Sequence, residues 1–393
     1  MGTQVGIGVS TKLDSTLAGR EAAREAYSHL REHPDVIFVF ISPIFEQEEA
    51  IKGIRSVIKG CLLVGCSSVG SITSGGCFLG AVAVCAIAST DISFSSSASL
   101  NVSRNARLAG NKAAKESICA KNSDRQLYIM FTDCLSGNMA DVLRGAQEIL
   151  GTRFPIIGGS AVDNFQFRKT WQYLNNDILS DSVVGLFIGG NINVGIGVSH
   201  GWQPVGSPHR ITRSSSNILK EIDRRPAIEL YNEYLGKDPG ELLKEGIGKL
   251  GCNYPLGIRI KDKDTYMTRS PIRIEDNGAL VLSAEIPEHK NINLMIGDNN
   301  LALEATREAC REALKNSMGK NISFAIVFSD IARLQLLRKD QHKEVEIIRK
   351  ALGKDVPFFG CYTCGEYAPV DLYGYSGQSY FHNQAISIAL FSN

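Results

Sequence analysis

The segment Phe358-Phe-Gly-Cys-Tyr-Thr-Cys-Gly-Glu-Tyr-Ala-Pro369 has two shorter counterparts earlier in the chain, Leu63-Val-Gly-Cys-Ser-Ser-Val-Gly70 and Ile156-Ile-Gly-Gly-Ser-Ala-Val-Asp163. In each, two apolar residues lead into a glycine turn that carries a hydroxyl side chain at its centre. A short apolar run that ends at glycine is typical of a buried strand followed by a tight loop, because glycine lacks the Cβ that such a loop would crowd. Three such turns in one chain indicate a repeated unit.

Strands and helices are predicted to alternate along most of the chain. Apolar runs predict strands at residues 4–9, 36–41, 79–88, 127–132, 183–188, 322–328 and 385–390. Ala and Leu recurring every three or four residues between charged ones predict helices at residues 17–30, 48–58, 108–118, 140–150, 301–315 and 343–352. This order favours an α/β fold of internally duplicated βαβαββ-type units, in which helices cover mixed sheets.

A short exact repeat supports this duplication. Val194-Gly-Ile-Gly-Val-Ser199 is identical to Val5-Gly-Ile-Gly-Val-Ser10, and both stand where a unit would begin. Two repeats fill residues 1–200, and a third begins near residue 300.

Residues 201–290 break the pattern. Pro204, Pro208 and the polar run at 213–217 predict a loop. A helix at 227–235 and short strands at 256–260, 265–269 and 279–282 are predicted to follow. We expect a smaller β-rich insertion here.

Composition limits the classes of partner. Lys and Arg number 42 against 41 Asp and Glu, so net charge provides no long-range attraction to nucleic acid or an anionic membrane. A small molecule or another protein is the expected partner. No secretion signal or membrane span is recognised, and ten scattered cysteines are typical of reduced thiols rather than a disulfide framework. These features predict a cytoplasmic protein.

Several motifs resemble those of the FIST (F-box and intracellular signal transduction) sensory domain family. They are the Gly-x-Gly-x-Ser unit openings, His200-Gly-Trp-Gln-Pro204, Leu294-Met-Ile-Gly-Asp298 and the closing segment from Phe359 to Pro369. The resemblance implies an amino-terminal module over residues 1–200 and a carboxy-terminal module over residues 201–393. It also implies a sensory input domain of signal transduction that binds small ligands such as amino acids. Because the chain begins at the first module strand, we expect it to signal through a separate protein partner.

The chain departs from the family pattern at one place. Ser329-Asp-Ile-Ala-Arg333 stands where the family has Ser-Cys-x-x-Arg, so Asp330 replaces a thiol. An acid here would favour a ligand with a cationic group.

Polar residues at the predicted strand ends are the candidate ligand-binding set, because α/β folds commonly place ligand loops there. The turn hydroxyls and loop N–H groups can hold a carboxylate, and Glu366 can hold an amine. The alternatives are that the turn glycines only allow close packing and that Glu366 is simply solvated. Arg269 and Arg333 stand where the family pattern has Arg and can bind a carboxylate in two-pronged fashion, although an intramolecular ion pair is an Arg's more usual role. The full set is Arg269, Arg333, Thr363, Glu366, Ser67, Ser160, Asp163 and Asp330.

Asp133 and Asp330 each follow an apolar strand and a Thr or Ser. An Asp at this position is often a helix cap, and paired positions in two repeats also fit a shared pocket wall.

Other kinds of site receive less support. Cys361 and Cys364 have the spacing of thiol redox centres and of half a zinc site, but no second Cys or His pair accompanies them, so small residues packed in a turn are favoured. We expect no metal or cofactor; bound haem, with His200 or His382 as axial ligand, is an alternative. No hydrolase elbow, phosphate loop or metalloprotease helix is present. An acyl-transfer or hydrolytic enzyme using Cys66 is the other alternative, although no base for it is recognisable.

Overall fold

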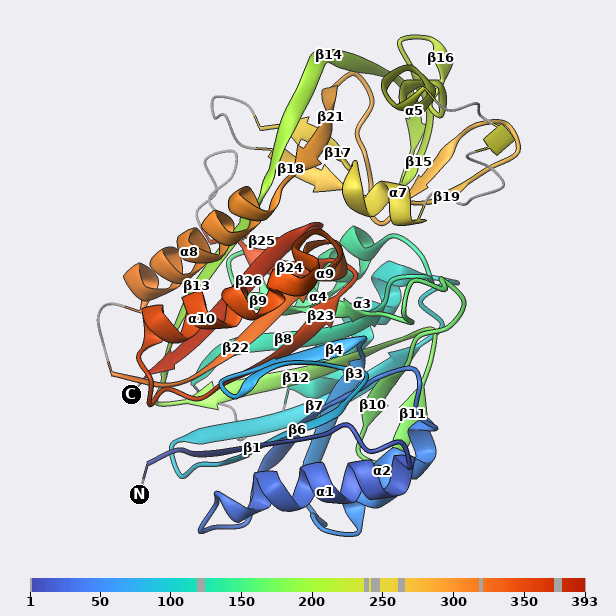
Figure 1. Ribbon diagram of the computed structural model, residues 1–393. Coiled ribbons are helices and arrows are strands. Elements are labelled where there is room, and N and C mark those ends of the chain that lie inside the picture. Colours follow the sequence, from blue (N-terminus) through green and yellow to red (C-terminus); the bar gives the residue numbers. More distant parts are fainter. Residues whose placement is uncertain are drawn as a thin grey trace.

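A computed structural model of the chain describes residues 2–118, 124–236, 240–241, 248–260, 266–317, 321–370 and 377–392. The predicted α/β class is confirmed, since helices cover several mixed sheets (Figure 1). Three six-stranded sheets form a body, and strands from residues 202–297 form an eight-stranded sheet that lies above it in Figure 1. No helix in the described part of the chain has the length and apolar character of a membrane span.

The body consists of three units with similar element order. The first unit contains β1 (Gln4–Ser10), α1 (Ser15–Ser28), β2 (Val36–Ile41), α2 (Gln47–Arg55), β3 (Leu62–Ser67), β4 (Gly70–Thr73), β5 (Gly76–Leu79) and β6 (Val82–Ala88). The second contains β7 (Ile92–Leu100), α3 (Ala106–Ser117), β8 (Arg125–Asp133), α4 (Met139–Leu150), β9 (Ile156–Ala161), β10 (Gln172–Leu174), β11 (Asp177–Leu179) and β12 (Ser182–Gly190). The third contains β13 (Asn193–His200), α8 (Asn299–Asn316), β22 (Ile322–Asp330), α9 (Ile331–Leu337), the 3₁₀ turn η1 (Arg338–Asp340), α10 (Gln341–Leu352), β23 (Phe358–Thr363), β24 (Glu366–Pro369), β25 (Ser379–His382) and β26 (Ala385–Ser392).

Each unit completes the sheet of another. The sheet orders are β1-β6-β2-β3-β10-β11, β25-β24-β9-β8-β12-β7 and β13-β26-β22-β23-β4-β5. Four strands of each sheet therefore come from one unit, and the outer hairpin comes from a different unit. The hairpin β4–β5 joins the third unit, β10–β11 joins the first, and β24–β25 joins the second. This exchange closes the units into a ring, although their origin by duplication stays a prediction.

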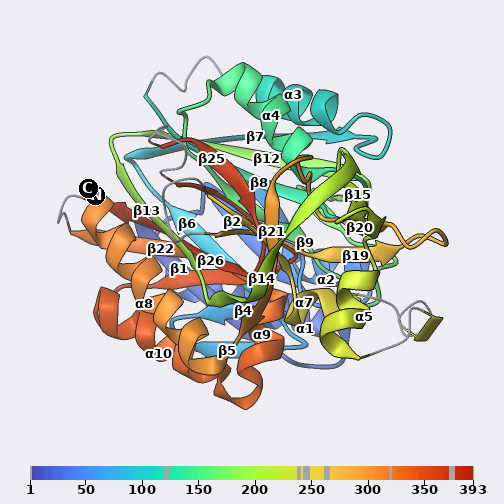
Figure 2. The ribbon, with the colours of Figure 1, turned by 90° about the horizontal axis from the view of Figure 1, so that it is seen from above.

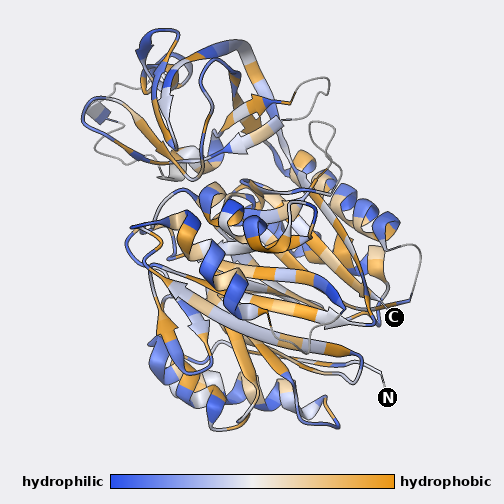
Figure 3. Ribbon diagram, turned by 180° about the vertical axis from the view of Figure 1, so that it is seen from behind, coloured by the Kyte–Doolittle hydropathy of each residue, from blue (hydrophilic) through white to orange (hydrophobic). Residues whose placement is uncertain are grey.

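The helices lie outside the sheets in pairs. Figure 2 shows α3 with α4 on one side of the body and α8 with α10 on another. Apolar residues are concentrated in the strands, whereas the helices carry polar residues on their outer faces (Figure 3). Phe40, Phe131 and Phe328 come from β2, β8 and β22 and meet in the shared core. Ring centroids are 5.9 Å apart for Phe40 and Phe131 and 6.0 Å apart for Phe131 and Phe328, both in edge-to-face geometry.

The six-residue repeat has a packing role. A Cβ on Gly8 would lie 2.1 Å from the carbonyl oxygen of Ala22 in α1, and a Cβ on Gly197 would lie 2.1 Å from that of Ala309 in α8. Only glycine allows a helix to approach a strand this closely.

Strand β7 was not predicted, because its sequence Ile-Ser-Phe-Ser-Ser-Ser-Ala-Ser-Leu is rich in serine. Two of its hydroxyls donate to backbone carbonyls of the neighbouring helix α3. Ser95 donates to the Ser117 carbonyl and Ser97 to the Ala113 carbonyl, each at 2.6 Å.

The insertion contains β14 (Trp202–Ser215), β15 (Ile218–Ile222), β16 (Arg225–Pro226), α5 (Glu229–Leu235), α7 (Gly248–Asn253), β17 (Leu256–Arg259), β18 (Tyr266–Arg269), β19 (Pro271–Ile274), β20 (Leu280–Leu282) and β21 (Asn291–Gly297). The predicted loop over its first residues is wrong, because β14 pairs with both β21 and β15. Pro204 takes part in this pairing opposite Met295, and Pro208 lies where the register shifts between Val205 and His209. A bulge of this kind tolerates proline, which cannot donate to the ladder.

Candidate functional site

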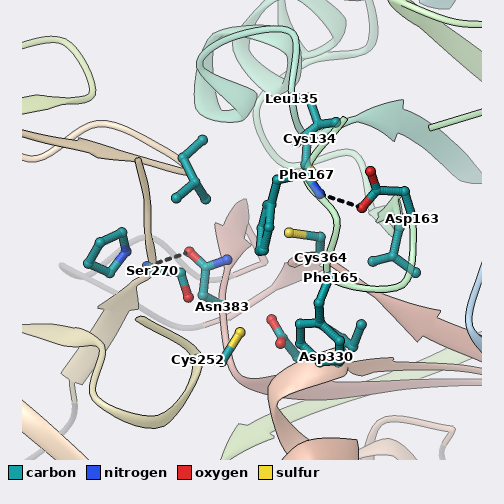
Figure 4. Close-up of a pocket in the computed structure, with 14 residues that line it drawn as sticks. Cys134, Leu135, Asp163, Phe165, Phe167, Cys252, Ser270, Asp330, Cys364 and Asn383 are labelled. Atoms are coloured by element: carbon teal, nitrogen blue, oxygen red, sulfur yellow. Dashed lines mark hydrogen bonds between the residues drawn. The ribbon is translucent and has the colours of Figure 1, made fainter. Parts of the chain in front are cut away.

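A cavity lies where the carboxyl ends of β8, β9, β22 and β23 meet the insertion (Figure 4). Its free volume is about 20 Å³, room for about one water molecule. The body and insertion both contribute to its wall, which contains Cys134, Leu135, Val162, Asp163, Phe165, Phe167, Cys252, Ser270, Pro271, Ile272, Asp330, Ile331, Cys364 and Asn383.

Asp330 supplies a buried carboxylate to this wall. It ends β22 and caps α9, and its side chain accepts hydrogen bonds from the backbone N–H groups of Ala332 and Gln384, both at 2.8 Å. Burial raises the pKa of Asp330 to about 6, and these backbone donors oppose the shift only in part. Asp330 can therefore change its protonation state near neutral pH.

Asp133 makes the same backbone contacts at the equivalent strand end. Its carboxylate accepts from the N–H groups of Leu135 at 3.0 Å and Asp181 at 2.9 Å. Asp181 and Gln384, with φ of 50° and 55°, occupy matching turns. Asp330 thus caps α9, whereas Asp133 binds the turn before α4, whose cap is Asn138, and of the two aspartates only Asp330 is part of the cavity wall.

Asn383 provides an unused donor opposite this acid. Its Oδ1 accepts from the Ser270 N–H at 3.4 Å and the Ser283 hydroxyl at 2.5 Å. Its Nδ2 has no hydrogen-bond partner among the described residues, and Figure 4 shows it pointing into the cavity. Because an unsatisfied buried donor costs about 1–3 kcal/mol, this geometry is suited to a bound acceptor group.

Thr363 and Glu366 lie behind the wall rather than in it. Thr363 Oγ1 donates to Glu366 Oε1 at 2.6 Å, and Glu366 Oε2 has no partner among the described residues. Glu366 is fully buried, so the reading of it as a solvated residue is wrong. Burial, followed by the charge of Asp330, raises the pKa of Glu366 well above its usual value. Burial and the neighbouring Asp330 carboxylate therefore both favour the neutral form of Glu366.

Asp163 lies in the wall and organises the loop that covers the cavity. Its carboxylate accepts from the N–H groups of Phe167, Arg168 and Lys169 at 2.9, 2.5 and 3.0 Å. Phe165 and Phe167 in this loop have φ of 61° and 52°, conformations that side chains other than glycine rarely adopt. Such strain is often found where a structure serves a ligand.

Ser67, in the first glycine turn, joins the first unit to the second, whereas the Ser160 hydroxyl, in the second turn, bonds a hydroxyl within its own unit. Ser67 Oγ donates to the Val162 carbonyl at 2.9 Å and accepts from Trp171 N at 3.1 Å. Ser160 Oγ lies 2.8 Å from Thr132 Oγ1. Neither serine contributes to the cavity wall.

The third turn differs from the other two by one residue. In the parallel ladders, Ser67 pairs with Ile41 and Ser160 pairs with Thr132. The third-unit residue that corresponds to Ile41 and Thr132 is Ser329, and it pairs with Tyr362. Thr363 is therefore one position beyond the two serines, and its expected equivalence to them is wrong.

The turn glycines have a packing cause. A Cβ at Gly65, Gly158 or Gly360 would lie 1.8, 2.0 or 1.7 Å from a carbonyl oxygen of the neighbouring parallel strand.

Both candidate arginines are buried and engaged within the protein. Arg333 Nη2 pairs with Glu344 Oε1 at 2.7 Å and donates to the Ala302 carbonyl at 2.8 Å. Arg269 Nε donates to the Glu285 carbonyl at 2.9 Å. Neither arginine belongs to this cavity wall.

The two histidines considered for haem border a second hollow. Nε2 of His200 bonds the Tyr266 carbonyl at 2.8 Å, and Nε2 of His382 bonds that of Ala368 at 3.1 Å. Burial lowers the pKa of both imidazoles, to about 4 for His382. Within the residues described, no group of three or more His, Cys, Asp or Glu side chains is placed to hold a metal ion.

The sequence did not reveal several wall residues, chief among them Asn383, Cys134, Cys252 and the two phenylalanines. Asn383 precedes the last strand of the third unit, so aligning the units at their closing turns would have drawn attention to it. Cys252 comes from the insertion, whose placement over the strand ends has no local signal.

Family comparison agrees with the motifs. The FIST N domain matches residues 35–225 and the FIST C domain matches residues 227–369. The chain belongs to the FIST family. FIST domains are assigned as small-ligand sensor domains in signalling.

The chain is similar to uncharacterized proteins of other organisms. The uncharacterized protein MJ1623 of Methanocaldococcus jannaschii is 27% identical over 284 residues, which are 67% of this chain and 54% of that protein. The present chain thus spans about half the length of that relative. The uncharacterized protein Rv0628c of Mycobacterium tuberculosis is 21% identical over 398 residues, 99% of each chain. A cyanuric acid hydrolase from A. caulinodans aligns with 99% of each chain at 7% identity and a TM-score of 0.38, a likeness too low to bear on fold or function.

Proposed function

We propose that this FIST protein is a small-ligand sensor whose ligand binds between Asp330 and Asn383. The proposed ligand is an amino acid or similar polar metabolite with an amine and a hydrogen-bond acceptor. The observation that supports this most directly is the Asn383 Nδ2 group, which is buried, unpartnered among the described residues and directed into the cavity.

The wall chemistry suits such a ligand. A ligand amine would donate to the Asp330 carboxylate, and a ligand carboxylate or carbonyl would accept from Asn383 Nδ2. Phe165 and Phe167 would cover an apolar part of the ligand. Since the free volume is about 20 Å³, these two rings must move outward for a metabolite to enter.

Binding has a direct connection to the joint between body and insertion. The turn that carries Asn383 binds Asp330 through Gln384 N at 2.8 Å and binds the insertion through Ser270 and Ser283. A ligand that contacts Asp330 and Asn383 would therefore alter how firmly the insertion is held. We propose that a separate signalling protein recognises this difference.

A thermal-shift screen over amino acids and related metabolites tests the proposal. A ligand at about one hundred times its dissociation constant stabilises the folded state by about 2.7 kcal/mol. Asn383→Ala and Asp330→Asn should abolish the stabilisation by any active compound.

Asp133→Asn is the matched control, because Asp133 makes equivalent backbone contacts outside the cavity. The proposal fails if no compound stabilises the protein, or if the Asp133 variant loses the response as completely as the Asp330 variant.

A further inference from the structure

The two cysteines of the Cys361-Tyr-Thr-Cys364 segment face different surroundings. Cys361 lies in the central core cluster together with Cys66, and burial, followed by Cys66, raises the pKa of the Cys361 thiol. Cys364 lies in the cavity wall together with Cys134. Cys361 and Cys364, although close in sequence, therefore belong to different clusters, and each shares its cluster with a cysteine from another unit.

Cys134 and Cys364 converge on the end of β9. Cys134 Sγ donates to the Ala161 carbonyl at 3.5 Å, and Cys364 N donates to the Ser160 carbonyl at 2.9 Å. Both side chains belong to the same core cluster, and the Cys364 thiol is close enough to raise the pKa of the Cys134 thiol. Both cysteines are in connections that follow strands, the first between β8 and α4 and the second between β23 and β24. Such connections can make the small adjustment that brings two sulfurs to a bonding distance of about 2.05 Å.

We propose that Cys134 and Cys364 are a redox-active dithiol that a hydroperoxide converts into a disulfide. One thiol takes an oxygen from the peroxide, the O–O bond breaks, and a sulfenic acid forms with release of water or an alcohol. The second sulfur then attacks the sulfenic sulfur, so that an S–S bond forms, the S–O bond breaks, and the hydroxyl leaves as water. The protein loses two protons and two electrons, and the peroxide gains them. The chemistry of this modification does not require the proposed ligand.

Burial makes the pair slow to react until the cavity opens. Contact with Cys364, burial and the charges of Asp133 and Asp163 raise the pKa of the Cys134 thiol. The thiol form therefore dominates at neutral pH, and the thiolate that attacks peroxide is scarce. Peroxide can reach Cys134 and Cys364 through the cavity, because both belong to its wall. Cys66 and Cys361 are fully buried and are not part of the wall, so we expect peroxide not to reach them.

Peptide mapping tests the proposal on the full-length protein. The reduced protein is treated with hydrogen peroxide, free thiols are alkylated in denaturant, and the digest is examined by mass spectrometry without reductant. We expect a linked pair of peptides containing Cys134 and Cys364, separable by dithiothreitol, while Cys66 and Cys361 are recovered alkylated.

Two variants sharpen the assignment. Cys134→Ser should abolish the link, and Cys252→Ser should retain it although Cys252 belongs to the same wall. A link between Cys364 and Cys252, oxidation of both thiol pairs at equal rates, or recovery of Cys134 and Cys364 as thiols after other cysteines have oxidised would overturn the proposal. The wild-type map decides the matter by itself if the Cys134 variant does not fold.

Discussion

Substitution of Asp330 by Asn should change how stability depends on pH. Burial raises the pKa of Asp330 from 3.8 to about 6. One pKa unit corresponds to about 1.4 kcal/mol, so the ionised carboxylate costs the folded state about 3 kcal/mol. Because the folded state holds this proton more tightly than the unfolded state, the free energy of unfolding falls as pH rises from about 4 to about 6, and the loss persists above that range. Asn has no charge to bury and avoids this loss.

Urea unfolding at pH 4, 5, 6 and 7, followed by the fluorescence of Trp171 and Trp202, measures the effect. The difference in unfolding free energy between Asp330→Asn and wild type should become more favourable to the variant by about 2.4 kcal/mol between pH 4 and pH 7. Glu366 is present in both proteins, so its own titration largely cancels, apart from its coupling to Asp330.

The Asn side chain also weakens the bonds to two backbone N–H groups. The Asp133 carboxylate also accepts hydrogen bonds from two backbone N–H groups. Asp133→Asn therefore measures the loss of stability that comes from weakening such bonds. An Asp330→Asn effect that is equal at pH 4 and pH 7 would refute the reasoning, since it would mean that burial does not penalise the carboxylate.

Two further predictions concern packing and charge. Gly65→Ala should destabilise the protein strongly or prevent folding, because its Cβ would lie 1.8 Å from the Val39 carbonyl oxygen, whereas Gly75→Ala, with its nearest contact at 3.5 Å, should fold with little loss in a thermal melt. Arg333→Met should cost about 3–5 kcal/mol in urea unfolding by leaving the Glu344 charge buried and unpaired. Adding Glu344→Leu should restore most of that stability; a double variant as unstable as the single one would contradict this role of the ion pair.

Local pattern predicted most of the regular elements of the body. Apolar runs found β2 and β22, and helical periodicity found α4 and α8, because these segments bury one face or all of their length against the same core. Patterning failed for β7, which contains serines that bond to a helix. It also failed for β14, which has one proline in the ladder and another at a register shift.

Of the residues proposed from sequence for the site, only Asp163 and Asp330 line the cavity. Arg333 has a guanidinium group that could bind the carboxylate of a ligand. In the fold, however, it is paired with the carboxylate of Glu344. Asn383 has no distinctive local pattern, and it stands out only because the fold buries its amide beside an empty cavity.

The closing segment at residues 358–369 shows the same division. By itself the sequence determined its buried strand, its tight turn and its family, because these depend on neighbouring residues and on the small size of glycine. Only the tertiary structure decided that Tyr362 rather than Thr363 aligns with the two serines, that Glu366 is buried, and that Cys361 and Cys364 contact different partners. These outcomes depend on hairpins exchanged between distant units, and the choice of a distant partner strand leaves no mark on local periodicity.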